Sequence, residues 1–150
     1  MQLKKAEQRF NLTTRDYAKL AEFRRALRAF LRFSEGAAAD VGLTAQHYQA
    51  MLILRAAEEE QPVTINDLAQ ELLIKHNSAV GLVDRLVRQR LVARGSSTKD
   101  RRKVELSLTA EGRKVLGKLA AMHRQQLQTS GPVIERHLAD LSRPQRRRRR

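Results

Sequence analysis

Apolar residues recur along much of the chain at steps of three and four, the spacing that gathers them on one side of an α-helix. The first such pattern follows Thr13 and Thr14, either of which can cap a helix starting there. Gly36 and a turn at Gly42 are predicted to close this region. Its apolar positions are Tyr17, Leu20, Phe23, Leu27, Phe30 and Leu31.

Two more helical patterns stand further along the chain. One begins after Thr44 and fades before Pro62. The other begins after Thr109, which can cap it, and carries Val115, Leu116, Leu119, Met122 and Leu127. The Gly131-Pro132 pair predicts a break in this helix, followed by a separate final helix with Val133, Ile134, Leu138 and Leu141.

Between these patterns lie two shorter helices in close succession. The stretch "VTINDLAQELL" has Thr64 or Asn66 as its cap and directs Leu68, Ala69 and Leu72 inward. The stretch "IKHNSAVGLVDRLVRQR" directs Ala79, Leu82, Val83 and Leu86 inward. Only about three residues around Ile74 separate the two helices, which is the arrangement of a helix-turn-helix.

A period-2 pattern follows and predicts a β-hairpin. "LVAR" and "VELSL" read as strands, the second alternating Val104, Leu106 and Leu108 with Glu105 and Ser107. The connecting segment "GSSTKDRRK" favours a turn with a basic tip. A charged tip of this kind repels itself unless an anion lies against it, so the hairpin reads as a nucleic-acid-binding wing.

Charge supports a polyanionic partner. The 150 residues include 30 basic and 16 acidic ones, a net charge of +14, and residues 1–142 alone carry +8. Between Lys75 and Lys103 there are nine basic residues and two acidic ones. Such a concentration suits nucleic acid first and an anionic membrane surface second. The remaining excess lies in a basic tail over 143–150, which is predicted to be disordered.

Composition argues against catalysis, cofactors and membrane insertion. Without cysteine there is no disulfide or thiolate, and the four histidines never stand at the i, i+4 spacing of a helical metal site. No phosphate-binding glycine loop or Ser-His-Asp motif is evident. We therefore expect no metal, no cofactor and no enzymatic activity. The longest aliphatic run, "AMLIL", is too short to span a bilayer, and a cytoplasmic protein is expected.

The outward side of the second short helix and the hairpin tip are the predicted DNA contacts. The first turns of a helix in the major groove reach base edges, while basic residues further along bind phosphates. An ordinary solvated helix face and a flexible charged loop are the alternatives. The predicted contacts are Lys75, His76, Asn77, Ser78, Gly81, Arg85 and Arg88 on the helix, and Lys99, Arg101, Arg102 and Lys103 at the tip.

The helix pair, followed by "DRLVRQRLVAR" and "DRRKVELSLTAEG", resembles the MarR family of winged-helix transcription factors. The resemblance implies a mainly α (α+β) fold, a winged helix-turn-helix with long N- and C-terminal dimerisation helices. In this chain these are 13–42 and 109–142, flanking a DNA-binding lobe at 43–108 within one domain, 1–142. Two positions depart from the usual pattern: Lys75 where a capping Ser or Thr is more common, and Leu73 where many helix-turn-helix units carry Gly.

The resemblance also assigns roles to single residues. Arg102 corresponds to the tip arginine that enters the minor groove, and Asp100 to an internal brace that orients an arginine. Many family members bind phenolic or other aromatic acids between the dimer helices and the lobe. Such an effector site here would draw on Phe23, Arg24, Phe30, His47 and Tyr48, for each of which core packing or surface exposure is the alternative.

Together these patterns predict a homodimeric, sequence-specific transcription regulator, a repressor, that binds a pseudo-palindromic duplex. Two alternatives remain at this point. One is an architectural protein that binds DNA with weak specificity through general charge. The other is a basic helical module that binds anionic membranes or acidic proteins.

Overall fold

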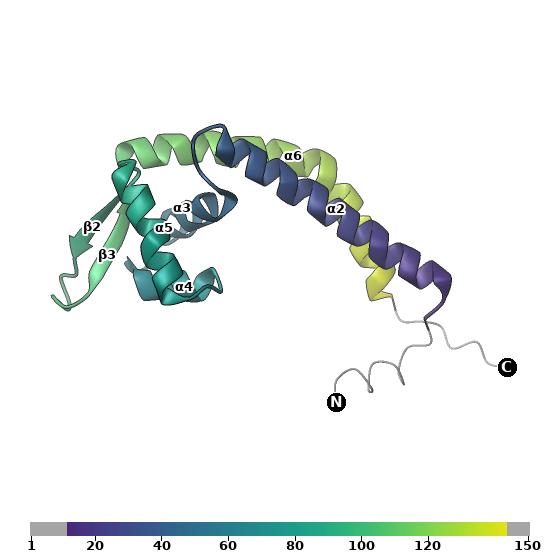
Figure 1. The fold of residues 1–150 in the computed structure, drawn as a ribbon, viewed down its shortest axis with the longest axis horizontal. Coiled ribbons are helices and arrows are strands. Elements are labelled where there is room, and N and C mark those ends of the chain that lie inside the picture. Colours follow the sequence, from purple (N-terminus) through teal and green to yellow (C-terminus); the bar gives the residue numbers. More distant parts are fainter. Residues whose placement is uncertain (1–11, 144–150) are drawn as a thin grey trace, which may run out of the picture. The chain divides into compact units, whose positions relative to one another are not determined.

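A computed structural model describes residues 12–143. Its elements are α2 (Thr14–Ala39), α3 (Ala45–Ala56), β1 (Val63–Thr64), α4 (Ile65–Glu71), α5 (His76–Arg88), β2 (Val92–Ser96), β3 (Val104–Leu108) and α6 (Ala110–Ser142) (Figure 1). They form two compact units. Residues 34–124 make up one, called the lobe here, and the described residues before 34 and after 124 make up the other, called the helical unit.

Three helices begin with the same capping box, a threonine paired with the residue three positions later. In α3 the Thr44 backbone N–H donates to His47 Nδ1 at 3.1 Å, and in α4 the Thr64 N–H donates to Asp67 Oδ2 at 2.9 Å. At α2 the cap is Thr13, whose hydroxyl accepts from the backbone N–H of Asp16 at 3.3 Å. The structure thus selects Thr13 over Thr14 and Thr64 over Asn66 as caps, and α3 begins after Thr44 as predicted. The helix α2, however, continues through Gly36 to Ala39.

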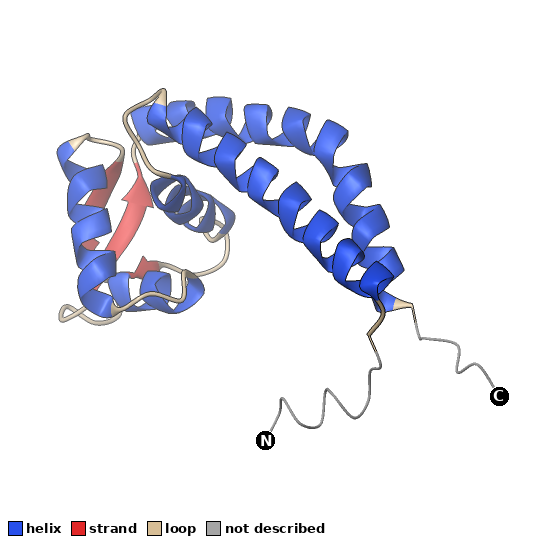
Figure 2. Cartoon of the chain, turned by 45° about the vertical axis from the view of Figure 1, so that its right-hand side comes forward, coloured by secondary structure: helices blue, strands red, loops and turns tan. Residues whose placement is uncertain are grey.

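The lobe places a small sheet beside α3, α4, α5 and the parts of α2 and α6 that lie within residues 34–124 (Figure 2). The sheet is antiparallel with strand order β1-β3-β2, and Val63 pairs with Leu106 while Val92 pairs with Leu108. The sequence prediction missed β1, because two residues are too short to carry a period. The core of the lobe contains the fully buried side chains of Met51, Leu68, Val83, Leu86, Val92 and Leu119.

His123 of α6 ties three elements of the lobe together. Its Nδ1 donates to the Leu119 carbonyl oxygen at 2.7 Å, since a carbonyl only accepts, and its Nε2 lies 2.8 Å from Ser34 Oγ. The ring stacks on Tyr48 of α3 with centroids 4.0 Å apart. This histidine therefore has a packing role that links α2, α3 and α6 inside the lobe.

The predicted break at Gly131-Pro132 is wrong, because α6 runs without interruption from Ala110 to Ser142 with Pro132 inside it. A proline in a helix removes one backbone N–H and the hydrogen bond that it would donate, but it still has helical φ. The residues on both sides retain their own hydrogen bonds, and Ser130 Oγ also donates to the Gln126 carbonyl at 2.9 Å. Proline locally weakens this helix without ending it.

The helical unit exposes large apolar side chains. Its parts of α2 and α6 run alongside one another, with His137 Nδ1 3.9 Å from Glu22 Oε2 (Figures 1 and 2). Tyr17 is 61% exposed, and the other exposed apolar residues of the unit's helices are Leu20, Leu31, Leu127, Val133 and Leu138. Across residues 12–143, no helix combines the length and apolar content needed to cross a membrane.

Candidate nucleic-acid interface

The second helix of the helix-turn-helix buries one face and exposes the other. Ala79, Leu82, Val83 and Leu86 of α5 are buried, as the spacing predicts. Lys75 is the N-cap but makes no side-chain capping bond, so the first turn of α5 keeps unpaired backbone N–H groups available. The predicted contact residues of this helix are all exposed: Lys75, His76, Asn77, Ser78, Gly81, Arg85 and Arg88.

The hairpin tip is held by hydrogen bonds from within. Ser97 is buried, and its Oγ accepts from the backbone N–H groups of Lys99 and Asp100, each at 3.2 Å. Asp100 Oδ1 in turn accepts from the backbone N–H of Arg102 at 3.0 Å. Asp100 therefore braces the backbone that carries Arg102, whereas the arginine side chains of the tip remain exposed. Sequence reasoning missed Ser97, since a serine in a turn gives no sign of burial.

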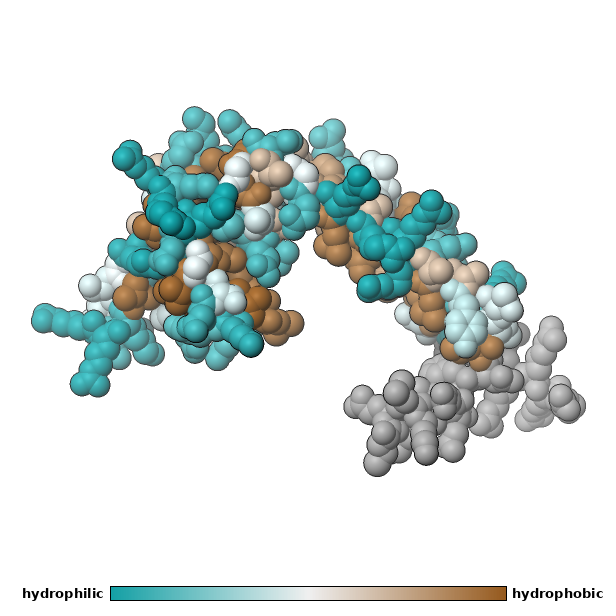
Figure 3. Space-filling view, in the orientation of Figure 1, coloured by the Kyte–Doolittle hydropathy of each residue, from teal (hydrophilic) through white to brown (hydrophobic). Residues whose placement is uncertain are grey.

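The tip and the first turn of α5 lie at the same end of the lobe in both ribbon views (Figures 1 and 2). Asp84 of α5 forms an ion pair with Arg94 of β2, which couples the helix to the wing. In Figure 3, hydrophilic side chains project from the end of the lobe where Figure 1 places the hairpin. The first turn of α5 and the tip of the wing thus lie toward the same end of the lobe.

Arg85 has a partner inside the lobe. Its Nη2 and the Nε2 of Gln89 each donate to the Gly42 carbonyl oxygen at 3.2 Å. Gly42 lies in the turn between α2 and α3 and has a positive φ of 75°. These bonds fix the end of α5 to the turn that precedes α3, a contact that no local sequence pattern predicts.

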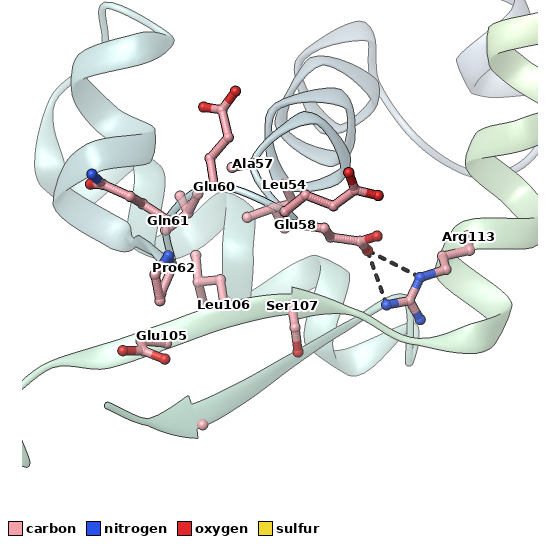
Figure 4. A pocket seen from close by; sticks show the side chains of 13 residues that line it. Leu54, Ala57, Glu58, Glu60, Gln61, Pro62, Glu105, Leu106, Ser107 and Arg113 are labelled. Atoms are coloured by element: carbon pink, nitrogen blue, oxygen red, sulfur yellow. Dashed lines mark hydrogen bonds and ion pairs between the residues drawn. The ribbon is translucent and has the colours of Figure 1, made fainter. Parts of the chain in front are cut away.

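Negative charge gathers elsewhere in the lobe, around the turn after α3. A depression of about 580 Å³ there is lined by the glutamates 58–60 and by Glu105 of β3 (Figure 4). Glu58 accepts from Arg113 Nε at 3.0 Å and from Arg55 Nη1 at 2.8 Å. The glutamates of this turn outnumber their basic neighbours, so the depression is an unfavourable place for a polyanion.

Residues 41–103, which contain α5 and the wing tip, match the sequence model of the MarR family. The HTH-type transcriptional repressor MdtR of Bacillus subtilis is 32% identical over 62 residues. That alignment covers 41% of this chain and 40% of the relative's own length. The part of this chain that carries α5 and the wing is therefore similar to the MarR family.

The fold agrees with solved structures of MarR-family regulators over a longer stretch. MepR, a transcription regulator of the Staphylococcus aureus multidrug efflux pump MepA, aligns with a TM-score of 0.69 and 20% identity. The alignment covers 80% of this chain and 90% of that one. The transcriptional repressor CouR, solved on a 23-mer DNA duplex, has a TM-score of 0.63 and 25% identity over 80% of this chain and 89% of its own.

The predicted effector residues of this chain are distributed over both units. Phe23, Arg24 and Phe30 lie on α2 in the helical unit, and His47 and Tyr48 are buried in the lobe. His47 serves the α3 capping box and Tyr48 stacks on His123. The observed contacts of these two residues are thus packing contacts, and an effector role for the set stays a prediction.

His47 makes the stability of the lobe depend on pH. Burial, and secondarily the charge of Arg85, lower the pKa of His47 below its usual value of about 6.5. The folded state therefore binds fewer protons than the unfolded one between the lowered pKa and 6.5. The contribution of His47 is fully present above about pH 6.5, and it is lost as the pH falls through this window.

Chemical denaturation at a series of pH values tests this expectation. The free energy of unfolding should fall from pH 7 to pH 5 more steeply for the native chain than for His47→Gln. Glutamine is the matched variant because it fills the same place in a capping box without titrating. The other histidines are common to both chains and do not affect the difference. If the two plots of the free energy of unfolding against pH are parallel, groups other than His47 cause the pH dependence.

Proposed function

We propose that this protein is a sequence-specific DNA-binding transcription regulator, a repressor, that binds a pseudo-palindromic duplex as a homodimer. The observation that carries the proposal is that the exposed first turn of α5 and the basic tip over Lys99–Lys103 lie at the same end of the lobe. A helix fits the major groove and a basic hairpin reaches the adjacent minor groove or phosphates. The relatives support it, since MdtR is named a repressor and CouR was solved on a DNA duplex.

The exposed apolar side chains of the helical unit support a dimer. Leu20 and Leu31 of α2 are 41% and 48% exposed, and Leu127 and Leu138 of α6 are 44% and 45% exposed. A second copy would cover such a face with the same face of its own and present two α5 helices to one side of a duplex. Light scattering should then give twice the 17.1 kDa mass of the chain.

Selection of bound duplexes from a random pool tests the DNA-binding proposal directly. We expect enrichment of one inverted repeat, bound at physiological salt at least about a thousandfold more tightly than random duplex. Comparable affinity for both would favour a weakly specific architectural protein instead. Binding to anionic vesicles without binding to duplex DNA would favour the membrane alternative. Dissociation of the selected complex by small aromatic acids then tests for an effector.

A further inference from the structure

Three helices of the lobe end in the same type of cap. In each, a residue with positive φ follows the helix, and two backbone hydrogen bonds close the turn. These residues are Gly42 (φ 75°) after α2, Leu73 (φ 55°) after α4 and Arg90 (φ 59°) after α5. At α4 the Leu73 N–H donates to the Gln70 carbonyl at 3.1 Å and the next N–H, of Ile74, to the Ala69 carbonyl at 3.0 Å.

Glycine is the favoured residue at this position, because a Cβ strains the backbone at positive φ. Leu73 has this strain and gains nothing from packing, since it is 92% exposed. Replacing it by glycine would relieve the strain and sacrifice no core contact. Neither local conformation nor folding stability accounts for a leucine at this position.

Its location offers a reason. Leu73 lies in the turn between α4 and α5, three residues before His76, which opens α5. The neighbouring residues on the α5 side, from Lys75 to Ser78, are polar or charged and all exposed. Leu73 is thus a large apolar side chain presented at the border of the surface proposed to meet DNA.

We propose that Leu73 is a specificity-determining residue that contacts the 5-methyl group of thymine at the edge of the major groove. This inference rests on the DNA-binding function proposed above. The thymine methyl is the apolar group that the base edges present in this groove, and apolar side chains recognise it by direct contact. Contact would remove both apolar groups from water, which compensates in the complex for the strain carried by the free protein.

Three substitutions separate strain from contact. Leu73→Gly removes both the strain and the side chain, Leu73→Ala keeps the strain but shortens the side chain, and Leu73→Met keeps both the strain and the apolar reach. Of these three variants, only Leu73→Gly should have a higher melting temperature than the native chain. Arg90→Gly, which relieves the same backbone strain after α5, should raise the melting temperature by a similar amount. Affinity for the selected duplex should fall about fivefold to tenfold in the glycine and alanine variants and be retained in the methionine variant.

The same duplex made with deoxyuridine in place of thymidine tests the chemical group, because uracil lacks only the methyl. The affinity of the native chain should be lower for this duplex by a similar factor, and Leu73→Gly should bind both duplexes with equal affinity. Equal affinity of the native chain for the two duplexes would overturn the proposal, as would unchanged affinity of Leu73→Gly. If the selection finds no preferred duplex, the DNA-binding function itself fails. If Arg102→Ala weakens binding and Leu73→Gly does not, only this inference fails.

Discussion

Alanine at position 112 is expected to lower the free energy of unfolding by about 3 kcal/mol and the melting temperature by roughly 10 °C. Gly112 lies in the first turn of α6, against Leu91 in the segment between α5 and β2. A Cβ there would lie 2.9 Å from the carbonyl carbon of Leu91 and still closer to its oxygen. These are backbone atoms, and they cannot turn aside as the end of a flexible side chain can.

Neighbouring hydrogen bonds show why the backbone cannot retreat. The hydroxyl of Thr109 donates to the Arg90 carbonyl at 2.6 Å and accepts from the Gly112 N–H at 2.9 Å. The Thr109 N–H donates to the same Leu91 carbonyl at 3.1 Å. Moving α6 away from Leu91 to admit a methyl group would break bonds that also position the start of the wing.

Gly117 of the same helix provides the matched control. It is exposed, and nothing lies within 4 Å of a Cβ placed there. Alanine at this position should stabilise the protein by about 0.5–1 kcal/mol, because it has the higher helix propensity. Thermal and denaturant unfolding of the two variants measure the contrast. Equal effects would show that the approach of Gly112 to Leu91 is not a constraint on the fold.

Arg102→Ala is expected to reduce affinity for the selected duplex by roughly tenfold to a hundredfold and to leave the thermal melt nearly unchanged. The side chain of Arg102 is exposed, and its backbone N–H donates to Asp100, so truncation removes a cation without disturbing the turn. At the narrow minor groove, where negative potential is enhanced, an arginine contributes both charge and shape recognition.

Lys118→Ala is the control for charge alone. Lys118 is an exposed basic residue of α6, outside both α5 and the hairpin tip. Its removal lowers the net charge by the same amount and should change affinity far less. A loss of affinity as large as that of Arg102→Ala would mean that binding follows net charge and not the geometry of the wing. Titrations at several salt concentrations separate the two effects.

The sequence by itself determined the elements that carry the proposed function. The inward positions of α5, the alternation in β3 and the caps at Thr44 and Thr64 follow from local rules, because each depends on residues only two to four positions apart. The concentration of basic residues between Lys75 and Lys103 is a property of composition, and it pointed to nucleic acid without any fold.

Only the tertiary structure decided what depends on contacts between distant residues. The ion pair of Asp84 with Arg94 and the bonds of Arg85 and Gln89 to Gly42 join different elements, so no local period could reveal them. The same holds for the contact of Gly112 with Leu91, which explains why this turn needs glycine.

The continuation of α6 through Pro132 and the left-handed caps at Leu73 and Arg90 run against local propensity. Propensities differ by at most a few kcal/mol, and hydrogen bonds and packing along a whole element can outweigh such differences. Local rules therefore identified which residues face outward. The tertiary structure decided where the helices end and which residues hold α5 and the wing at one end of the lobe.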